Sequence, residues 1–180
     1  MEFALNHNKD RIHASVANKH DEYFCPLCHK KVVLRQGKIN VEHFVHQSKC
    51  DDTWNYDMSA WHSQWQQQFP KNNQEIVVEV NGEKHRADVM ACGYVIEFQR
   101  SPISAEEFNE RNQFYLKYGK KVIWIFDLLE EFESGHIDCY EEWSNNSDNG
   151  GKFKWNYAKR FLQNYLPQVN KNVIVFFSIL

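Results

Sequence analysis

Two carboxylates in one short stretch of the chain have the residue type and spacing of metal ligands. Asp88 and Glu97 flank Cys92-Gly93, a turn dipeptide between two apolar runs that predict a β-hairpin. If the strands pair symmetrically about this turn, Asp88 lies opposite Glu97, and side-chain alternation places Gln99 on the same face. Two acids across a ladder repel each other unless a cation lies between them. The pair therefore suggests a divalent ion, and oxygen ligands favour Mg²⁺ or Mn²⁺.

The same hairpin has a simpler interpretation, which the spacing leaves equally open. Arg86 falls on the face of Asp88 and Glu97, so the two acids could be ordinary solvent-facing strand residues with this cation between them. The opposite face is predicted to pack in the core, and it carries Ala87, Val89, Ile96 and Phe98.

A second group of candidate metal ligands lies near the N-terminus. Cys25 and Cys28 have the C-x-x-C spacing of a zinc knuckle, and a predicted hairpin over residues 32–44 returns the chain towards them. His43, His46 and Cys50 follow, so five candidates compete for four places. We favour the set with His46 and Cys50, and His43 is the substitute. Because protein would fill all four places, the predicted zinc site is structural; the alternative is two reduced, buried thiols with surface histidines.

His62 belongs to a predicted amphipathic helix over residues 58–69. The apolar side chains recur at helical spacing, and Asp57 or Ser59 could cap the first turn. The apolar stripe consists of Met58, Trp61, Trp65 and Phe69. His62 and Gln66 share a neighbouring face and could point together into a site. A histidine beside such a stripe is more often a packing residue.

The other predicted elements give an order of helix, three strands, helix and strand. A strand over residues 75–80 leads through Asn81-Gly82 into the hairpin. A helix follows with Ser104 as its cap, then an apolar strand over residues 121–126, a helix over residues 157–166 and a strand over residues 172–178. Upstream, short β-like stretches cover residues 2–5 and 11–16. These patterns predict an α/β fold with a β-rich N-terminal region.

Composition leaves room for a nucleic-acid partner despite the net charge of −3. Residues 127–148 hold eight acidic residues and no Lys or Arg, and we interpret them as a solvated loop and helix surface. The rest of the chain has 16 acidic and 21 basic residues, a net charge of +5, which permits a polyanion. No apolar run suits a membrane span, and the first residues lack a signal peptide, so we expect a cytoplasmic protein without a membrane partner.

Several motifs, in order, resemble the CoiA-like competence-protein family. They are Cys25-Pro26-Leu27-Cys28, His43-Phe44-Val45-His46, Trp61-His62, His85 to Val89, Ile96 to Ser101, and Arg111 to Tyr115. The resemblance spans roughly residues 10–126. It implies a small zinc-binding region and a nuclease domain of the PD-(D/E)XK superfamily, with the acid and E-x-Q signature at Asp88, Glu97 and Gln99. The chain departs from the pattern at Gln66, where the family would have a Lys.

The resemblance and the residues together predict a Mg²⁺- or Mn²⁺-dependent nuclease. We expect domains at residues 1–54 and 55–180, the second with a restriction-endonuclease-like αβββαβ core. The predicted catalytic residues are Asp88, Glu97, Gln99 and His62, and the predicted substrate-binding residues are Arg86, Arg100, Arg111 and Tyr115. The expected substrate is DNA, with single-stranded or branched DNA suiting the aromatic content. The alternative is a catalytically weak or inactive module that binds DNA or a protein partner; a homo-oligomer also stays open.

Overall fold

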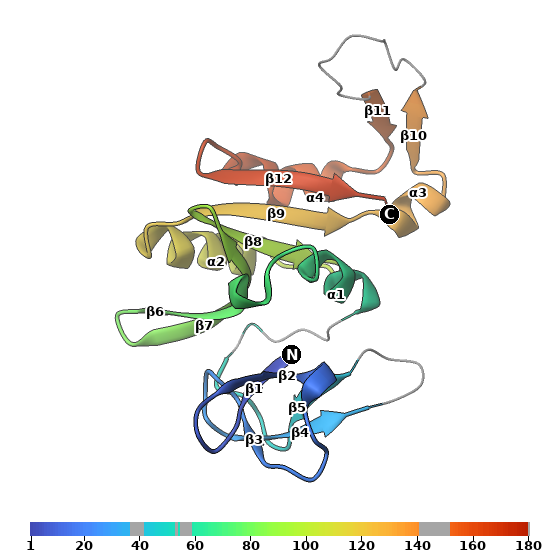
Figure 1. Ribbon diagram of the computed structural model, residues 1–180. Coiled ribbons are helices and arrows are strands. Elements are labelled where there is room, and N and C mark those ends of the chain that lie inside the picture. Colours follow the sequence, from blue (N-terminus) through green and yellow to red (C-terminus); the bar gives the residue numbers. More distant parts are fainter. Residues whose placement is uncertain (37–41, 53, 55–58, 141–151, 180) are drawn as a thin grey trace.

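The computed structural model describes residues 1–36, 42–52, 54, 59–140 and 152–179 (Figure 1). Its strands form two five-stranded sheets and one two-stranded sheet. The strands are β1 (Phe3–Leu5), β2 (Arg11–His13), β3 (Tyr23–Phe24), β4 (Lys31–Arg35), β5 (His43–His46), β6 (Gln74–Val80), β7 (Glu83–Ala91), β8 (Tyr94–Gln99), β9 (Lys121–Asp127), β10 (Ile137–Tyr140), β11 (Lys152–Trp155) and β12 (Val173–Ser178). The α-helices are α1 (Ala60–Gln66), α2 (Ala105–Lys117), α3 (Leu129–Glu133) and α4 (Lys159–Asn164).

The N-terminal region is a small β-rich unit, as predicted. Its sheet has the order β2-β1-β3-β4-β5 and packs around a core that includes Tyr23, Val32 and Phe44. The predicted stretch over residues 11–16 is a strand only to His13. Residues 14–16 turn into a 3₁₀-helix, because the His13 ring accepts the backbone N–H of Ser15. Residues 37–41, where the turn of the predicted hairpin falls, lie outside the described residues.

The second five-stranded sheet confirms the predicted mixed α/β core. Its order is β12-β9-β8-β7-β6, and the elements follow the chain as α1, β6, β7, β8, α2 and β9. Strand β7 pairs antiparallel with both β6 and β8, whereas β9 runs parallel to both β8 and β12. Val95 and Trp124 pack on the face covered by α2, and Ile96 and Ile123 pack on the face covered by α1. The sheet therefore has a helix on each face.

The predicted hairpin register is confirmed from the turn as far as the pair of Val89 and Ile96, one residue short of Asp88 and Glu97. Cys92 and Gly93 have φ values of 50° and 84°, which suits a tight two-residue hairpin turn, and Val89 pairs with Ile96. The pairing of β7 with β8 ends at Val89. The pairing of β7 with β6 includes Val89 and Ala87 but skips Asp88 between them. Ala87, predicted to share a face with Val89, packs instead in the cluster on the α2 side. Side chains of β7 no longer alternate regularly between the two faces of the sheet here, because Asp88 pairs with neither β6 nor β8.

Helices α1 and α2 each begin at a serine cap. The Ser59 hydroxyl accepts the backbone N–H of His62 at 3.1 Å and starts α1; the other predicted cap, Asp57, lies outside the described residues, as does Met58 of the apolar stripe. The Ser104 hydroxyl accepts the backbone N–H of Glu107 at 3.0 Å and starts α2, as predicted. These two caps fix the first turns of the helices that cover the two faces of the sheet.

The C-terminal part adds β12 to the parallel side of the sheet. The helix predicted over residues 157–166 forms as the shorter α4, and the predicted last strand is β12. Part of the acidic segment forms α3 and β10, and residues 141–151 lie outside the described residues. None of the described helices has both the length and the apolar character that crossing a membrane requires.

A buried carboxylate joins the N-terminal sheet to the second sheet. Glu75 of β6 accepts the backbone N–H of Glu2 at 2.7 Å and that of Phe3 at 3.1 Å. It does so from a left-handed backbone conformation, with a φ of 45°. Ser63 of α1 donates to the Glu2 carboxylate at 2.5 Å, so strand β1 is held by both β6 and α1. The N-terminal sheet and the second sheet are therefore joined by buried hydrogen bonds, and neither region could form these bonds without the other.

We expect Glu75→Ala to lower the free energy of unfolding by about 3 kcal/mol, because two backbone donors lose a charged acceptor. Glu79→Ala on the same strand is the matched control. Its exposed ion pair with Lys84 spans 3.3 Å, and its loss is expected to cost less than about 0.5 kcal/mol. Urea unfolding of both variants measures the difference, and equal effects would contradict this role of Glu75.

Candidate functional site

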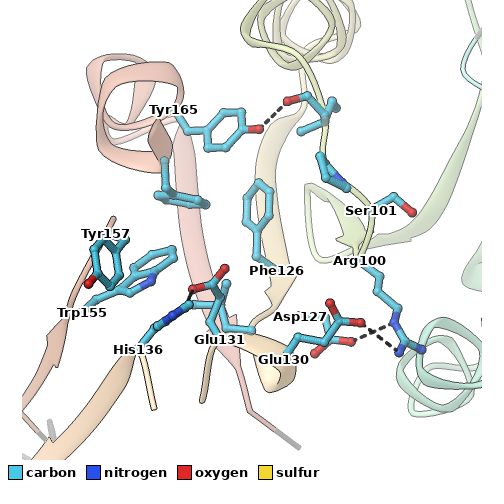
Figure 2. Close-up of a pocket in the computed structure, with 14 residues that line it drawn as sticks. Arg100, Ser101, Phe126, Asp127, Glu130, Glu131, His136, Trp155, Tyr157 and Tyr165 are labelled. Carbon is cyan, nitrogen blue, oxygen red and sulfur yellow. Dashed lines mark hydrogen bonds and ion pairs between the residues drawn. The ribbon is translucent and has the colours of Figure 1, made fainter. Parts of the chain in front are cut away.

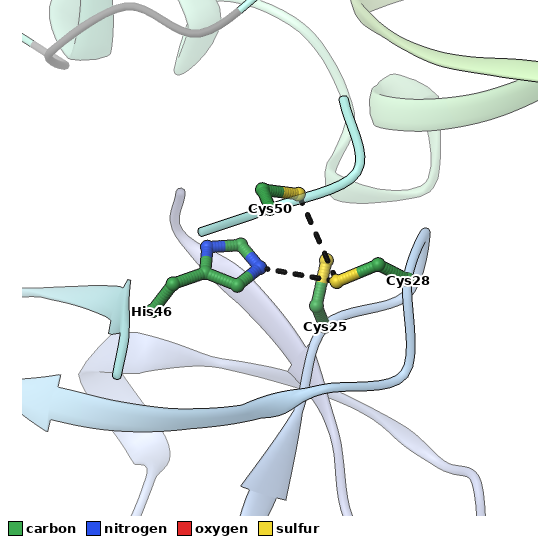
Figure 3. A group of neighbouring side chains, drawn as sticks. All are labelled: Cys25, Cys28, His46 and Cys50. Carbon is green, nitrogen blue, oxygen red and sulfur yellow. Dashed lines mark hydrogen bonds between the residues drawn. The ribbon is translucent and has the colours of Figure 1, made fainter. Parts of the chain in front are cut away.

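Four sulfur and nitrogen side chains of the N-terminal region converge on one point (Figure 3). The ligand atoms of Cys25, Cys28, His46 and Cys50 all lie within 4.8 Å of one another. Cys28 Sγ is 3.4 Å from His46 Nε2 and 3.7 Å from Cys50 Sγ. Ligands of a tetrahedral zinc ion with ordinary bond lengths lie about 3.5–3.8 Å apart, so these separations fit such an ion. Within the described residues, these four side chains form the group whose ligand atoms lie close enough together to share a metal ion. His43, the predicted substitute, is not part of it.

The local fold of the knuckle explains why these residues meet. Cys25 follows β3 directly, and its carbonyl accepts the backbone N–H of His29, which has a φ of 57°. The backbone N–H of Leu27 points at the Cys25 sulfur at 3.4 Å. Burial raises the pKa of the Cys25 thiol to about 12. A bound cation would therefore have to displace its proton, as at other thiolate sites.

Asp88 lies in the opening that β7 makes between its neighbours. It is 1% exposed, and its Oδ2 accepts the backbone N–H of Phe98 at 2.9 Å. His62 of α1, itself 3% exposed, places Nε2 3.3 Å from Asp88 Oδ1. Gln66, one helical turn further along α1, donates to the Asp88 carbonyl at 3.1 Å. The predicted joint approach of His62 and Gln66 is thus observed, and their target is Asp88.

Glu97 faces the other helix. It is 1% exposed, with Oε2 2.9 Å from Arg111 Nη1 and Oε1 accepting the Tyr115 hydroxyl at 2.9 Å. Arg111 also contacts Glu107 at 2.5 Å, at i,i+4 spacing along α2. The predicted substrate-binding residues Arg111 and Tyr115 therefore both contact Glu97 in this structure.

Burial sets the protonation of this group of side chains. It raises the pKa of Asp88 well above its usual range, and the nearby charge of Glu97 adds to the effect. Burial also raises the pKa of Glu97, although Arg111 and Tyr115 oppose the rise. Burial, with a contribution from Arg86, lowers the pKa of His62 to about 3. The imidazole is thus neutral at neutral pH, so its 3.3 Å contact with Asp88 is not an ion pair.

The other predicted site residues lie at some remove from the two acids. The Gln99 side chain donates to the backbone carbonyl of Ser101 at 2.5 Å. Arg86 is close to Met1, with Nη1 3.4 Å from its sulfur, between the N-terminal region and the second sheet. Arg100 is half-exposed beyond the end of β8, with Nε 3.4 Å from Asp127.

A set of contacts not foreseen from the sequence connects the cysteine cluster with the acids. Asp52, two residues after Cys50, binds the His85 ring at 3.0 Å and accepts the backbone N–H of Arg86 at 3.3 Å. Trp54 stacks on His85, with ring centroids 3.3 Å apart, and lies 5.2 Å from the Arg111 guanidinium. Nothing in the local sequence pattern marked Asp52 or Trp54. The Glu107–Arg111 pair, in contrast, could have been found from its i,i+4 spacing.

The fold and these two sites define a nuclease-like α/β domain joined to a β-rich region with a Cys₃His cluster. Comparison with protein families agrees with that class. The N-terminal domain of competence protein CoiA matches residues 5–52, and the nuclease-like domain of competence protein CoiA matches residues 63–141. The chain belongs to the CoiA-like competence proteins, which confirms the resemblance seen in its motifs. No curated protein and no solved structure matched the chain.

We expect the purified protein to carry about one zinc ion per chain at the Cys₃His cluster. Cys28→Ser removes one of the four ligands and should weaken zinc binding by more than about 100-fold. Cys92→Ser is the control, because Cys92 is exposed in the β7–β8 turn, outside the cluster. Metal analysis after gel filtration gives the stoichiometry; equal zinc content in both variants would contradict the assignment.

Proposed function

We propose that this protein is a metal-dependent nuclease of the PD-(D/E)XK type that hydrolyses phosphodiester bonds of DNA. The observation that carries the proposal is the burial of both Asp88 and Glu97 at the break in the β7 ladder, where the charge of Glu97 adds to the rise in the pKa of Asp88. The match of residues 63–141 to a nuclease-like domain supports a nuclease-type function. The substrate and the ion belong to the proposal.

The donor set fits a hard divalent ion. Asp88 and Glu97 offer carboxylate oxygens, the ligands that Mg²⁺ and Mn²⁺ prefer, and a cation between them would relieve their repulsion. In this structure Arg111 and Tyr115 occupy both Glu97 oxygens, so an ion would have to share or displace them. When bound, such an ion polarises the scissile phosphate and lowers the pKa of the attacking water.

The remaining residues have defined parts in this proposal. His62 lies 3.3 Å from Asp88 and is neutral at neutral pH; since a pKa of about 3 makes it a weak proton acceptor, its part in this proposal is to donate a hydrogen bond to phosphate. Gln99 can orient a water or phosphate oxygen, but being neutral it cannot lower the pKa of the water as a Lys would. The cluster of Cys25, Cys28, His46 and Cys50 would hold a structural zinc ion, since protein atoms fill all four positions.

We expect Glu97→Gln to reduce cleavage of single-stranded DNA in Mg²⁺ or Mn²⁺ by about 100-fold or more, because the ion loses an anionic ligand worth several kcal/mol in the transition state. Glu106→Gln, the same change at an exposed position of α2, should leave cleavage within about twofold of wild type. Gel analysis of labelled single- and double-stranded DNA measures both variants. Undiminished cleavage by Glu97→Gln would exclude this site.

A second candidate function is DNA binding without turnover, and one observation favours it. Arg111 is 4% exposed, forms ion pairs with both Glu97 and Glu107, and already supplies the positive charge that a metal would bring. Gln66 also stands where the family pattern has a Lys. In this case the fold would have kept the acid pair with a guanidinium as its permanent counterion.

The two candidates differ in the response of thermal stability to Mn²⁺. In zinc-loaded protein the nuclease proposal predicts that Mn²⁺ at about 100 times its Kd raises the melting temperature by roughly 5–10 °C. The binding-only candidate predicts no shift for wild type. It predicts a new Mn²⁺-dependent shift for Arg111→Met, which frees Glu97 of its counterion. A shift in wild type that Glu97→Gln abolishes would exclude the binding-only candidate.

A further inference from the structure

A pocket of about 360 Å³ opens at the ends of the parallel strands, beyond the two acids (Figure 2). Arg100 and Ser101, which follow β8, form one side of it, and Phe126 and Asp127 at the end of β9 form another. The crevice beyond the carboxyl ends of parallel strands is the usual ligand site of open α/β sheets. The volume is also within the range of small-molecule sites.

Five of the fourteen residues that line the pocket are Phe, Tyr or Trp. Phe126 and Tyr165 are buried and stacked, with centroids 5.3 Å apart, and the Tyr165 hydroxyl is held by the carbonyl of Ile103. Phe161 packs against both of these rings and also against Trp155, with a Trp155–Phe161 centroid distance of 5.1 Å, so the four rings form one continuous aromatic wall. Tyr157 stands at the mouth, 84% exposed, with a φ of 66°. Its ring contacts that of His136, with centroids 5.1 Å apart, and is otherwise exposed, so it can pack on a flat ligand that enters the pocket.

The polar groups of the pocket limit the class of ligand that it could bind. The indole Nε1 of Trp155 is buried and has no hydrogen-bond partner among the described residues, so it lacks an acceptor. Asp127, Glu130 and Glu131 add negative charge, which would repel a phosphate from the interior. Arg100, 47% exposed in its side chain, is the cation beside the opening. The interior thus suits an uncharged, planar ligand with acceptor atoms, and a phosphate would stay outside near Arg100.

We propose that this pocket binds an unpaired nucleobase of a single-stranded nucleic acid. The inference rests on the proposed function, because it assigns the substrate class of the same protein. Gln99 bonds to Ser101 of the pocket wall, so a base held here is one short segment away from the acids. A base within a duplex is stacked on both faces and cannot enter the pocket unless it is flipped out.

Fluorescence anisotropy without added Mg²⁺ or Mn²⁺ tests the pocket by binding alone. The probes are an oligonucleotide of about 15 deoxyadenosines, a strand of equal length made of abasic sites, and the duplex of the first strand. We expect the deoxyadenosine strand to bind about tenfold more tightly than the abasic strand, because stacking is lost without bases. The duplex should bind no better than the abasic strand.

Tyr157→Gly should lower the affinity for the deoxyadenosine strand about tenfold and leave the abasic strand unchanged. Glycine accepts the positive φ at this position, so the backbone is not strained. Trp155→Phe keeps the aromatic wall and removes only the N–H, and should cause a smaller loss. Tyr118→Ser is the matched control, since Tyr118 is a 42% exposed aromatic residue outside the pocket.

Equal affinity for the deoxyadenosine and abasic strands, or equal effects of the Tyr157 and Tyr118 variants, would overturn the proposal. Cleavage is scored separately with wild type in Mn²⁺. Base-dependent binding without cleavage would uphold the pocket while refuting the nuclease proposal. Cleavage that is lost in Glu97→Gln, but does not depend on Tyr157 or on the presence of bases, would uphold the nuclease proposal and refute the pocket.

Discussion

The structure depends on the burial of two carboxylates, Asp88 and Glu97, at one point of the second sheet. Removing charge from water is costly, so every neighbouring element contributes a compensating group. Strand β8 gives the Phe98 backbone N–H, and α1 gives His62. Helix α2 gives the guanidinium and the phenol that hold Glu97. The burial of these two acids is the observation on which the proposed metal site rests.

The N-terminal region is structurally continuous with that point. Asp52 and Trp54 follow the last cysteine of the cluster and contact His85, three residues before Asp88 on the same strand. Trp54 also lies against Arg111, the partner of Glu97. On the other side, Glu75 holds the first strand of the N-terminal sheet. The Cys₃His cluster therefore lies next to the segment that packs beside the acids, without itself reaching them.

Local patterns in the sequence were enough for the order of elements, the hairpin register and the set of four ligands around Cys25. Those features follow from turn residues, caps and the C-x-x-C spacing, which act over a few residues. The alternation argument failed at Ala87, because β7 departs from both neighbours at Asp88. The commitment of Arg111 to Glu97 and the aromatic pocket arise from residues far apart in the chain, and periodicity carries no information about such contacts.

The most direct test of this account is a crystal structure of the zinc-loaded protein grown with Mn²⁺, with anomalous scattering used to locate the ions. The account predicts an anomalous peak at ordinary metal–oxygen distance, about 2.0–2.2 Å, from carboxylate oxygens of both Asp88 and Glu97, with Arg111 moved from Glu97 Oε2. An Arg111–Glu97 contact unchanged from 2.9 Å, with no peak between the acids at saturating Mn²⁺, would contradict it.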